Sequence, residues 1–284
     1  MEKYEDILNN AKELGRVEFI GKTELGFDIP LVHIGKEAKT LLIASVHARE
    51  YVTTDVLNAV IAEEKESLNV DYLPMLNIDG VLLAKNGLNS VENFFLRQKL
   101  LSINGNDDDF SQWKANINGV DINVNFDADW GEGRHNVTSP SSANYIGKRP
   151  HSEKETQAIV ELLKRNYALI ACYHSLGEEV YWGYEYNFKH YHYAKQYADY
   201  VGYKLKRSEY SSGGIKDYYS LNYQGLGLTI EMGEERYGHP YPKEKINTLI
   251  SRHKGSIALL EKIGEEISER VYGRSLVAGT HSFF

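Results

Sequence analysis

The chain has 284 residues, of which 42% are hydrophobic and 25% charged, so it is long enough to bury one large core. Its formal net charge of −8 argues against nucleic acid as the main partner, and no apolar stretch approaches the roughly 20 residues that a membrane span requires. The first six residues are polar and acidic, unlike a secretory signal, and a single cysteine fits a reducing compartment. We therefore expect a cytoplasmic location, with a spore location or unconventional release left open.

The expected secondary structure alternates between strands and helices, and no internal repeat or Pro/Gly-rich linker divides the chain. Such alternation predicts a mixed, mostly parallel sheet covered by helices on both faces. We therefore predict a single α/β domain over residues 1–284, with its core spanning residues 16–272. In chain order, the predicted elements are a helix at 3–14, a hairpin of strands 16–21 and 28–34, a strand at 40–46, a helix at 53–65, a strand at 70–76, a helix at 152–166, a strand at 167–174, a helix at 188–201, a strand at 203–208, a helix at 215–222, a strand at 226–232 and a helix at 243–270.

Capping and turn residues separate these elements. Thr53-Thr54-Asp55 and Ser152 are expected to cap the helices that follow them. Residues 77–80, Asn-Ile-Asp-Gly, have the composition of a turn. Residues 81–150 contain Asn-Gly, Asn-Asp and Gly-Glu-Gly breaks, which predict a long irregular segment. An irregular segment of this length in a compact domain is usually functional.

The most informative motif is His47-Ala-Arg-Glu50, which directly follows the apolar run of residues 41–46. The run predicts a buried strand, so an imidazole and a carboxylate lie three residues apart at the exit of that strand. Both groups are suitable zinc ligands. The spacing alone is weak support, but open α/β sheets place their functional sites beyond the carboxyl ends of their strands.

Two further predicted strands end in residues that would complete such a site. His174 is the last residue of its predicted strand, and Glu231 is among the last of another. Taken alone, His174 is more typical of a core histidine, and Glu231 of a paired structural acid. Two imidazoles and one carboxylate, however, form the ligand set of a hydrolytic zinc site, and the remaining glutamate is the general base that such a site needs.

Seven segments carry a resemblance to a known family: His47-Ala-Arg-Glu50, Asn77-Ile-Asp-Gly80, Gly119-Val-Asp-Ile-Asn-Val-Asn-Phe126, Tyr145-Ile-Gly-Lys-Arg-Pro-His-Ser-Glu153, His174, Gly213-Gly-Ile-Lys-Asp217 and Thr229-Ile-Glu231. In these segments, and in their order, the chain resembles zinc metallocarboxypeptidases of the carboxypeptidase A type. The resemblance implies an eight-stranded mixed sheet flanked by helices. It also implies one Zn²⁺ held by His47, Glu50 and His174, with Glu231 as base and proton shuttle.

Three positions depart from the pattern of this family, one of them Leu176, where the family usually has a tyrosine two residues after the second metal histidine. The family usually has an Asn-Arg pair that holds the terminal carboxylate of the substrate, and here these positions are Asn123 and Val124. Valine cannot bind a carboxylate, which leaves Asn123 as the candidate substrate-binding residue of the pair. The arginine that normally polarises the scissile carbonyl corresponds to Lys114. Lysine supplies a positive charge to an oxyanion without the bidentate geometry of arginine.

Other segments are similar to those of bacterial γ-D-glutamyl-meso-diaminopimelate peptidases, which cleave muropeptides between D-glutamate and diaminopimelate. These segments are Trp113-Lys-Ala-Asn116, Gly177-Glu-Glu-Val-Tyr-Trp-Gly183 and Gly213-Gly-Ile-Lys-Asp217. In a longer stem peptide the carboxyl group beside the scissile bond is already an amide, so a pocket without the arginine suits this substrate. The resemblance therefore implies a zinc-dependent peptidase whose expected partner is a small peptide, in particular a muropeptide.

Further residues are candidates for substrate binding. Lys216 precedes Asp217 at the floor of the family's side-chain pocket, where a lysine would favour an acidic group such as the distal carboxylate of diaminopimelate. Tyr210 lies close to the position of the family's mobile tyrosine. Arg134 and Arg149 are loop arginines that would replace the missing carboxylate clamp.

Three alternative functions remain open. The first is an ordinary metallocarboxypeptidase that removes C-terminal residues from peptides. The second is a deacylase of the aspartoacylase or succinylglutamate desuccinylase kind, which shares the His-x-x-Glu start, although the segments at 213–217 and 229–231 favour a peptidase. The third is a carboxypeptidase-like domain that only binds, although such domains have usually lost a metal ligand or the base.

Overall fold

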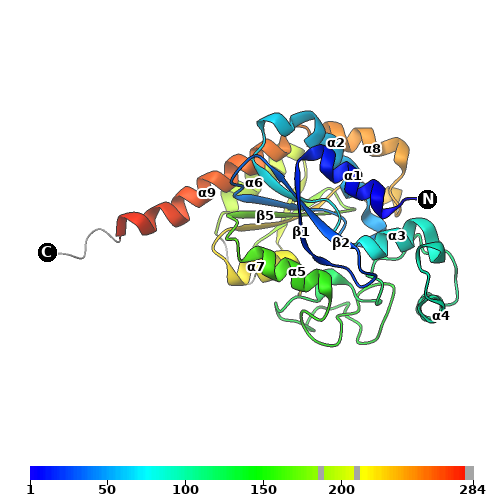
Figure 1. The fold of residues 1–284 in the computed structure, drawn as a ribbon. Coiled ribbons are helices and arrows are strands. Elements are labelled where there is room, and N and C mark those ends of the chain that lie inside the picture. Colours follow the sequence, from blue (N-terminus) through cyan, green and yellow to red (C-terminus); the bar gives the residue numbers. More distant parts are fainter. Residues whose placement is uncertain (185–188, 208–211, 279–284) are drawn as a thin grey trace.

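The structure is a computed structural model that describes residues 1–184, 189–207 and 212–278. In this part of the chain, eight strands form one sheet in the order β1-β2-β4-β3-β5-β8-β6-β7 (Figure 1). The strands are β1 Arg16–Lys22, β2 Asp28–Ile34, β3 Thr40–Ile43, β4 Val70–Leu73, β5 Leu169–His174, β6 Glu179–Trp182, β7 Lys204–Arg207 and β8 Leu226–Glu231.

The centre of the sheet is parallel. Strands β4, β3, β5 and β8 all run in the same direction, and β6 runs parallel to β7 at one end of the sheet. The β1–β2, β2–β4 and β6–β8 pairs are antiparallel. The expected eight-stranded, mixed and mostly parallel sheet is therefore confirmed. Because β3, β5 and β8 are neighbours with the same direction, their carboxyl ends meet at one edge.

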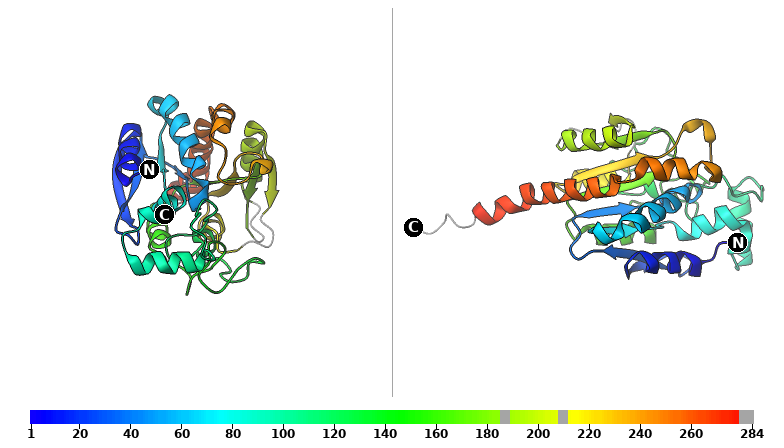
Figure 2. Two further views of the ribbon diagram at one scale, coloured as in Figure 1. Left: turned by 90° about the vertical axis from the view of Figure 1, so that its right-hand side faces the viewer. Right: turned by 90° about the horizontal axis from the view of Figure 1, so that it is seen from above.

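Helices cover both faces of this sheet (Figures 1 and 2). One face packs mainly against α1 Tyr4–Leu14, α2 Val52–Glu64, α6 Tyr191–Val201, α8 Ile246–His253 and α9 Ser256–Ala278. The other face packs against α5 Lys154–Leu163 and α7 Ile215–Asn222. Two further helices, α3 Ile78–Asn86 and α4 Phe94–Ile103, precede the long irregular segment. In the part of the chain described, no helix is both long and apolar enough to cross a membrane.

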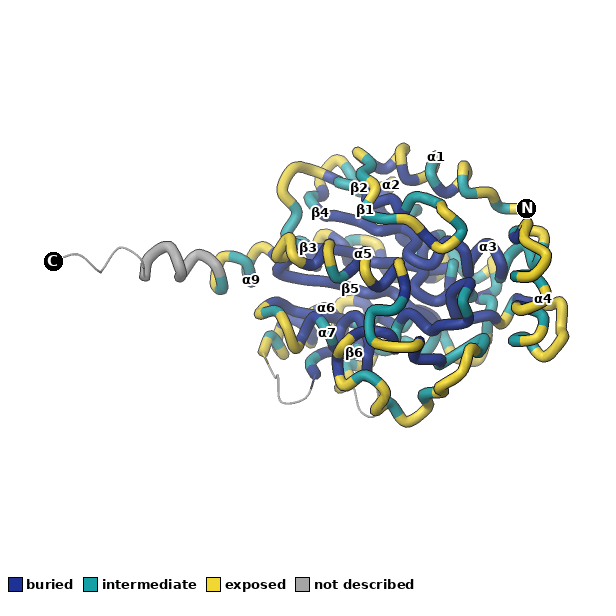
Figure 3. Tube along the Cα trace, turned by 60° about the horizontal axis from the view of Figure 1, so that its bottom comes forward, coloured by how far each residue is buried: buried dark blue, intermediate teal, exposed yellow. Residues whose placement is uncertain are grey.

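The central strands are buried on both faces, as their unbroken apolar sequences predict. Every residue of β3 and of β5 is buried, and the strands form the dark centre of Figure 3. Side chains of β3 alternate between the two cores, with Leu42 packed against the α2 side and Leu41 and Ile43 packed against the α5 side. Cys172 of β5 is buried in the second core, as expected for a strand residue.

The predicted turn at residues 77–80 is wrong, because these residues begin helix α3. Asn77 is the N-cap residue, and its side-chain oxygen accepts a hydrogen bond from the Gly80 backbone nitrogen. Helix α4 was also missed within the segment 81–150, so that the irregular stretch proper begins after Ile103. An Asn that hydrogen-bonds to the backbone of the following residues occurs both in turns and at helix N-termini. The composition of residues 77–80 therefore does not distinguish a turn from the start of a helix.

The predicted caps at Thr53 and Ser152 are also wrong. Helix α2 begins at Val52, and the Thr53 hydroxyl instead donates to the Glu50 carbonyl oxygen at 2.9 Å. The N-cap of α5 is Glu153, while the Ser152 hydroxyl donates to the Glu153 carboxylate. Both hydroxyls therefore stabilise the chain just before a helix rather than the first turn itself.

Two other predicted elements differ from the structure. The single helix expected at 243–270 is divided into α8 and α9, because Gly255 takes a positive φ of 74° between them. Strand β6 was not predicted, although its residues alternate between half-buried and buried. With only four residues, β6 carries too short a pattern to be recognised from sequence.

Candidate metal centre

Three neighbouring parallel strands bring the candidate residues together at one edge of the sheet. His174 is the last residue of β5, and it is paired in register with Glu231, the last residue of β8. His47 and Glu50 follow β3, which pairs with β5 on its other side. Residues separated by more than a hundred positions in sequence thus become neighbours, because the carboxyl ends of parallel strands coincide.

The backbone after β3 is fixed in a tight turn that presents the motif. Strand β3 ends at Ile43 rather than at residue 46, and Ser45 takes a positive φ of 47°. The Ser45 backbone nitrogen donates to the Thr53 hydroxyl at 2.9 Å, and its own hydroxyl lies 2.6 Å from that of Thr54. These buried hydrogen bonds hold the start of α2 against the strand exit, so His47 and Glu50 lie in a rigid turn.

The three predicted metal ligands form one compact cluster. His47, Glu50 and His174 are each at most 5% exposed, and one ligand atom from each lies within 4.8 Å of the others. Nδ1 of His174 lies 3.1 Å from Nδ1 of His47 and 3.1 Å from Oε2 of Glu50, and Nδ1 of His47 lies 2.9 Å from Oε1 of Glu50.

This cluster fits a small divalent cation. Ligands at about 2.0–2.1 Å from zinc in tetrahedral geometry lie about 3.3 Å from one another, close to the observed separations. Burial alone would raise the pKa of Glu50, but the positive charges and hydrogen bonds of His47 and His174 outweigh it and hold this pKa well below its usual range. Glu50 is therefore an ionised carboxylate, the form that binds a metal ion.

A fourth buried residue, Asp121, supports the cluster from outside. Its Oδ1 lies 3.2 Å from Nε2 of His47, on the side of the ring opposite to the proposed ligand atom. Its Oδ2 accepts a hydrogen bond from Lys114 Nζ at 2.6 Å. Burial would raise the pKa of Asp121, but the charges of Lys114 and His47 outweigh this effect and lower it. A carboxylate in this position fixes the orientation of a metal-binding histidine.

Asp121 was not identified as a site residue from sequence. It lies in the segment Gly119–Phe126, which carries part of the family resemblance, but no role was assigned to Asp121 itself. The signal that would have identified Asp121 is its position two residues before Asn123, in a turn that is expected to be buried. Its side chain also caps that turn, since Oδ1 accepts from the Asn123 backbone nitrogen at 3.0 Å.

Lys114 lies beside the cluster, attached to it through Asp121. Its ammonium also donates to Asn144 Oδ1 at 3.4 Å, and its backbone oxygen accepts from the nitrogen of Ala48, the residue after His47. Lys114 is partly buried, with 18% of its side chain exposed. A lysine ammonium has three N–H donors, so one remains for a substrate oxygen.

Glu231 has the properties of a base that works near neutral pH. It is half-buried, and burial raises its pKa to about 7, with repulsion from Glu50 acting in the same direction and attraction from His174 acting against it. A carboxyl group with a pKa close to the ambient pH can both accept and release a proton during turnover.

The predicted substrate-binding residues have different environments. The Asn123 side-chain oxygen accepts from the backbone nitrogen of Ile215, so it organises the Gly-Gly turn before α7. Lys216 is buried, its ammonium donates to the Gly183 carbonyl at 2.6 Å, and it forms an ion pair with Asp217. A buried charge requires a partner, and Asp217 supplies it, so the role of Lys216 in substrate binding stays a prediction that involves at most its third N–H.

The remaining candidates are not brought to the cluster. Arg134 is exposed in the irregular segment. Arg149 is exposed and lines a cavity to which His47, Glu50 and His174 do not contribute. Tyr210 lies outside the described residues. A residue not considered from sequence, His239, is half-buried, and burial lowers its pKa to about 4 in spite of the nearby Glu50 carboxylate.

Comparison with known proteins agrees with this geometry. A family model described as zinc carboxypeptidase matches residues 1–254. Gamma-D-glutamyl-L-diamino acid endopeptidase 1 of Lysinibacillus sphaericus is 31% identical over 260 residues, which covers 83% of this chain and 64% of that protein. Carboxypeptidase B of Bos taurus is 27% identical over 206 residues, which covers 65% of this chain and 46% of that protein. The chain thus spans less than two thirds of the length of these two relatives.

Solved structures share the fold at lower sequence identity. Bovine thrombin-activatable fibrinolysis inhibitor, in complex with a tick carboxypeptidase inhibitor, superposes with a TM-score of 0.74 at 18% identity, covering 95% of this chain and 98% of that chain. Murein-tripeptide amidase MpaA from Escherichia coli O157 has a TM-score of 0.58 at 19% identity, covering 87% and 94%. Since the family model extends over most of the sequence, the chain belongs to the zinc carboxypeptidase family of zinc-dependent peptidases.

Proposed function

We propose that this protein hydrolyses an amide bond in small peptides, and that its substrates are γ-D-glutamyl-diaminopimelate muropeptides. The observation that carries the proposal is the cluster of His47, Glu50 and His174, whose ligand atoms lie within 4.8 Å, with Glu231 in register beside it. We assign the first three as the ligands of one zinc ion and Glu231 as the general base.

The chemistry follows from the residues around this cluster. Zinc, when bound, supplies Lewis-acid activation of water and of the scissile carbonyl. Glu231 accepts a proton from the attacking water and returns it to the leaving amine, which its pKa of about 7 allows at neutral pH. Lys114 donates its remaining N–H to the developing oxyanion, with Asp121 holding the ammonium in place. Asp121 also keeps the His47 ring oriented.

The substrate class is supported by the residues that differ from ordinary carboxypeptidases. Val124 stands where a carboxylate-binding arginine is usual. The relative from Lysinibacillus sphaericus, which is 31% identical, is named a gamma-D-glutamyl-L-diamino acid endopeptidase. A substrate whose neighbouring carboxyl group is amidated needs no such arginine. Asn123 and the third N–H of Lys216 are proposed to contact the diamino acid, and Arg134 and Tyr210 the more distant part of the peptide.

An ordinary carboxypeptidase is the competing function, since carboxypeptidase B of Bos taurus is also similar to this chain. The test is a substrate panel for the zinc-loaded protein, with products identified by mass spectrometry. It contains a γ-D-glutamyl-diaminopimelate tripeptide, a longer stem peptide, a hippuryl amino acid and an N-acetyl amino acid. We expect cleavage between D-glutamate and diaminopimelate. A strong preference for the hippuryl substrate would establish the carboxypeptidase instead, and a preference for the acetyl substrate would establish a deacylase.

A further inference from the structure

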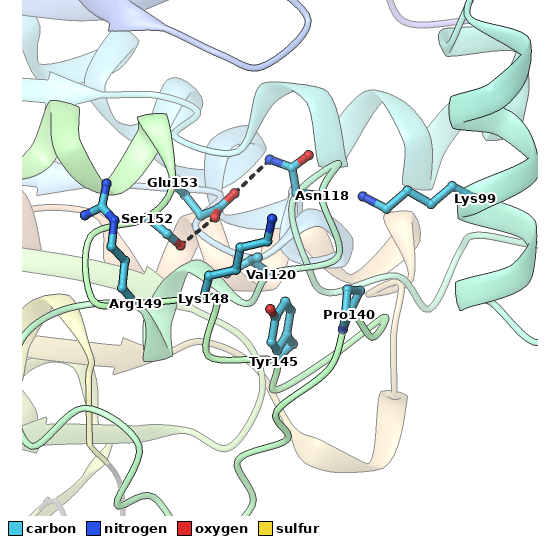
Figure 4. Close-up of a pocket in the computed structure, with 9 residues that line it drawn as sticks. All are labelled: Lys99, Asn118, Val120, Pro140, Tyr145, Lys148, Arg149, Ser152 and Glu153. Atoms are coloured by element: carbon cyan, nitrogen blue, oxygen red, sulfur yellow. Dashed lines mark hydrogen bonds between the residues drawn. The ribbon is translucent and has the colours of Figure 1, made fainter.

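A cavity of about 380 Å³ is lined by residues other than those of the metal centre (Figure 4). Lys99 reaches into it from α4, and Lys148, Arg149 and Tyr145 line it from the irregular segment that precedes α5. A volume of this size is typical of small-molecule sites. None of His47, Glu50, His174 and Glu231 is among its lining residues.

The cavity concentrates positive charge in a protein whose formal net charge is −8. Lys99 and Lys148 point into it from two sides (Figure 4), and within the described residues neither is assigned an ion pair or a hydrogen bond. The third cation, Arg149, donates to the Pro150 carbonyl oxygen at 3.3 Å, and the described residues provide no other partner for it. Cations that gather without acidic partners repel one another, and a bound anion would remove this repulsion.

The one acidic side chain in the cavity is already engaged by neutral groups. Glu153 is 6% exposed, and its oxygens accept hydrogen bonds from Ser152 at 2.6 Å, from Asn116 at 2.8 Å and from Asn118 at 2.9 Å. No ion pair joins Glu153 to either lysine among the described side chains. The carboxylate is therefore satisfied by hydroxyl and amide donors, and the ammonium groups are left for another partner.

The hydroxyl of a largely buried tyrosine adds a polar group to the same cavity. Tyr145 is only 6% exposed, and for its hydroxyl the described part of the chain provides no hydrogen-bond partner. A phenol whose ring is fixed by burial, in a cavity that two exposed lysines also line, can donate to an anionic oxygen. Asn118 contributes an amide from the opposite wall.

The cavity is connected to the metal centre by one short segment. Val120 lines the cavity, and its neighbour Asp121 lies 3.2 Å from Nε2 of His47. The Asp121 backbone nitrogen also donates to the carbonyl oxygen of Tyr145 at 2.9 Å. An occupant of the cavity would therefore contact Val120, the chain neighbour of Asp121, and Tyr145, its backbone hydrogen-bond partner.

We infer that this cavity is a binding site for a small multivalent oxyanion, that is, a compact molecule with two or more carboxylate or phosphate groups. Lys99 and Lys148 each meet one anionic group, Tyr145 donates to one of them, and Arg149 closes the outer side. The inference rests on the cavity and its charges alone, so it stands whether or not the proposed peptidase substrate is correct.

The test measures binding to the zinc-loaded, full-length chain by titration calorimetry at low ionic strength. The two probes are propane-1,2,3-tricarboxylate and inorganic phosphate, which separate a carboxylate site from a phosphate site. The pocket variant is Lys99→Gln/Lys148→Gln. The matched control is Lys12→Gln/Lys36→Gln, which makes the same change of net charge at two exposed lysines outside the cavity. A third variant, His174→Ala, removes a proposed zinc ligand and leaves the cavity intact.

We expect saturable binding of at least one probe, weakened about tenfold or more in the pocket variant and unchanged in the control. Tyr145→Phe should weaken binding about two- to threefold, since it removes one hydrogen bond and little volume. Binding should persist in His174→Ala, because the metal centre is not involved. The inference is overturned if neither probe binds, if the pocket variant and the control lose affinity equally, or if His174→Ala abolishes binding.

Discussion

His174 and Glu231 occupy directly paired positions at the ends of two adjacent parallel strands. One is a proposed zinc ligand and the other the proposed base, so the register of β5 against β8 sets the distance between metal and base. A slip of β8 by one residue against β5 would turn Glu231 to the face of the sheet opposite to His174. The relative position of these two residues is therefore set by backbone hydrogen bonds of the core, whereas His47 and Glu50 depend on the turn after β3.

Replacing Glu231 by glutamine should separate metal binding from turnover. The amide cannot accept the proton from water, so kcat should fall by about 10²–10⁴-fold, while the zinc content stays near one ion per chain. Peptidase assays combined with metal analysis measure both quantities. Glu235→Gln, at an exposed position four residues later, is the control and should keep full activity. An active Glu231→Gln variant would rule out the assignment of the base.

Removing the metal should abolish activity and lower stability together. Zinc that binds the native cluster but not the unfolded chain stabilises the fold by mass action, by about 4 kcal/mol when its concentration is a thousand times the dissociation constant. Chelation should therefore lower the melting temperature, and added zinc should restore both melting temperature and turnover. His174→Ala should melt at the same temperature with and without chelator; a zinc-dependent shift in this variant would contradict its role as a ligand.

Asp121→Asn should weaken zinc binding without removing a ligand. The substitution keeps the shape of the side chain but removes the charge beside His47 and Lys114. Loss of such an outer carboxylate typically costs about 10–100-fold in metal affinity. Competition with a chromophoric chelator gives the dissociation constant. Asp109→Asn, at an exposed position of the same irregular segment, is the control and should bind zinc as the parent protein does.

Lys216→Met should destabilise the protein because it leaves Asp217 buried without a counter-charge. Breaking a buried pair in this way costs about 3–5 kcal/mol. The double variant Lys216→Met/Asp217→Asn should recover part of this loss, since no uncompensated charge remains. Urea unfolding of the three proteins measures the difference. Equal stability of the single and double variants would show that the pair is not electrostatically coupled.

Glu155 should make the stability of the fold decrease with rising pH. Burial, together with repulsion from Asp79, raises the pKa of Glu155 from 4.5 to about 8, so the native state holds a proton that the unfolded chain releases. Its contribution is complete below pH 4.5 and is lost as the pH rises to about 8, with a slope of at most about 1.4 kcal/mol per pH unit.

Glu155→Gln tests this sign directly. Relative to the parent protein, the variant should be more stable at pH 8 and gain little at pH 5, because glutamine carries no charge at either pH. Urea unfolding of both proteins, freed of metal, gives the difference in the free energy of unfolding. The exposed Glu161→Gln on the same helix should show no such pH dependence. A stability difference that is equal at pH 5 and pH 8 would refute the buried proton.

The residues that sequence predicted best are those whose chemistry depends on strand position. Buried apolar runs located β3, β5 and β8, and the polar residues at their ends therefore had to meet if the strands were parallel neighbours. The order of the strands did not follow from the runs themselves; it came from the resemblance to a known family. The metal cluster was predicted because both the ligand types and their positions were specific.

What sequence did not predict are the partners of the charged residues. No residue close to Lys216 in the sequence indicates that the carbonyl oxygen of Gly183, which follows β6, accepts its hydrogen bond. Asp121 was missed for the same reason, since its contact with His47 joins residues 74 positions apart in the numbering. Such pairings depend on how loops pack, and loops carry no periodic signal.

The order of the strands along the chain also sets when the proposed site can be complete. The candidate ligands come from β3 and β5, and the base comes from β8, which is the last of the central strands to leave the ribosome. A nascent chain that ends before residue 226 can present the three metal-binding groups but has no group to receive the proton. The proposed ligands and the proposed base are therefore together only after β8 has been synthesised and has paired with β5.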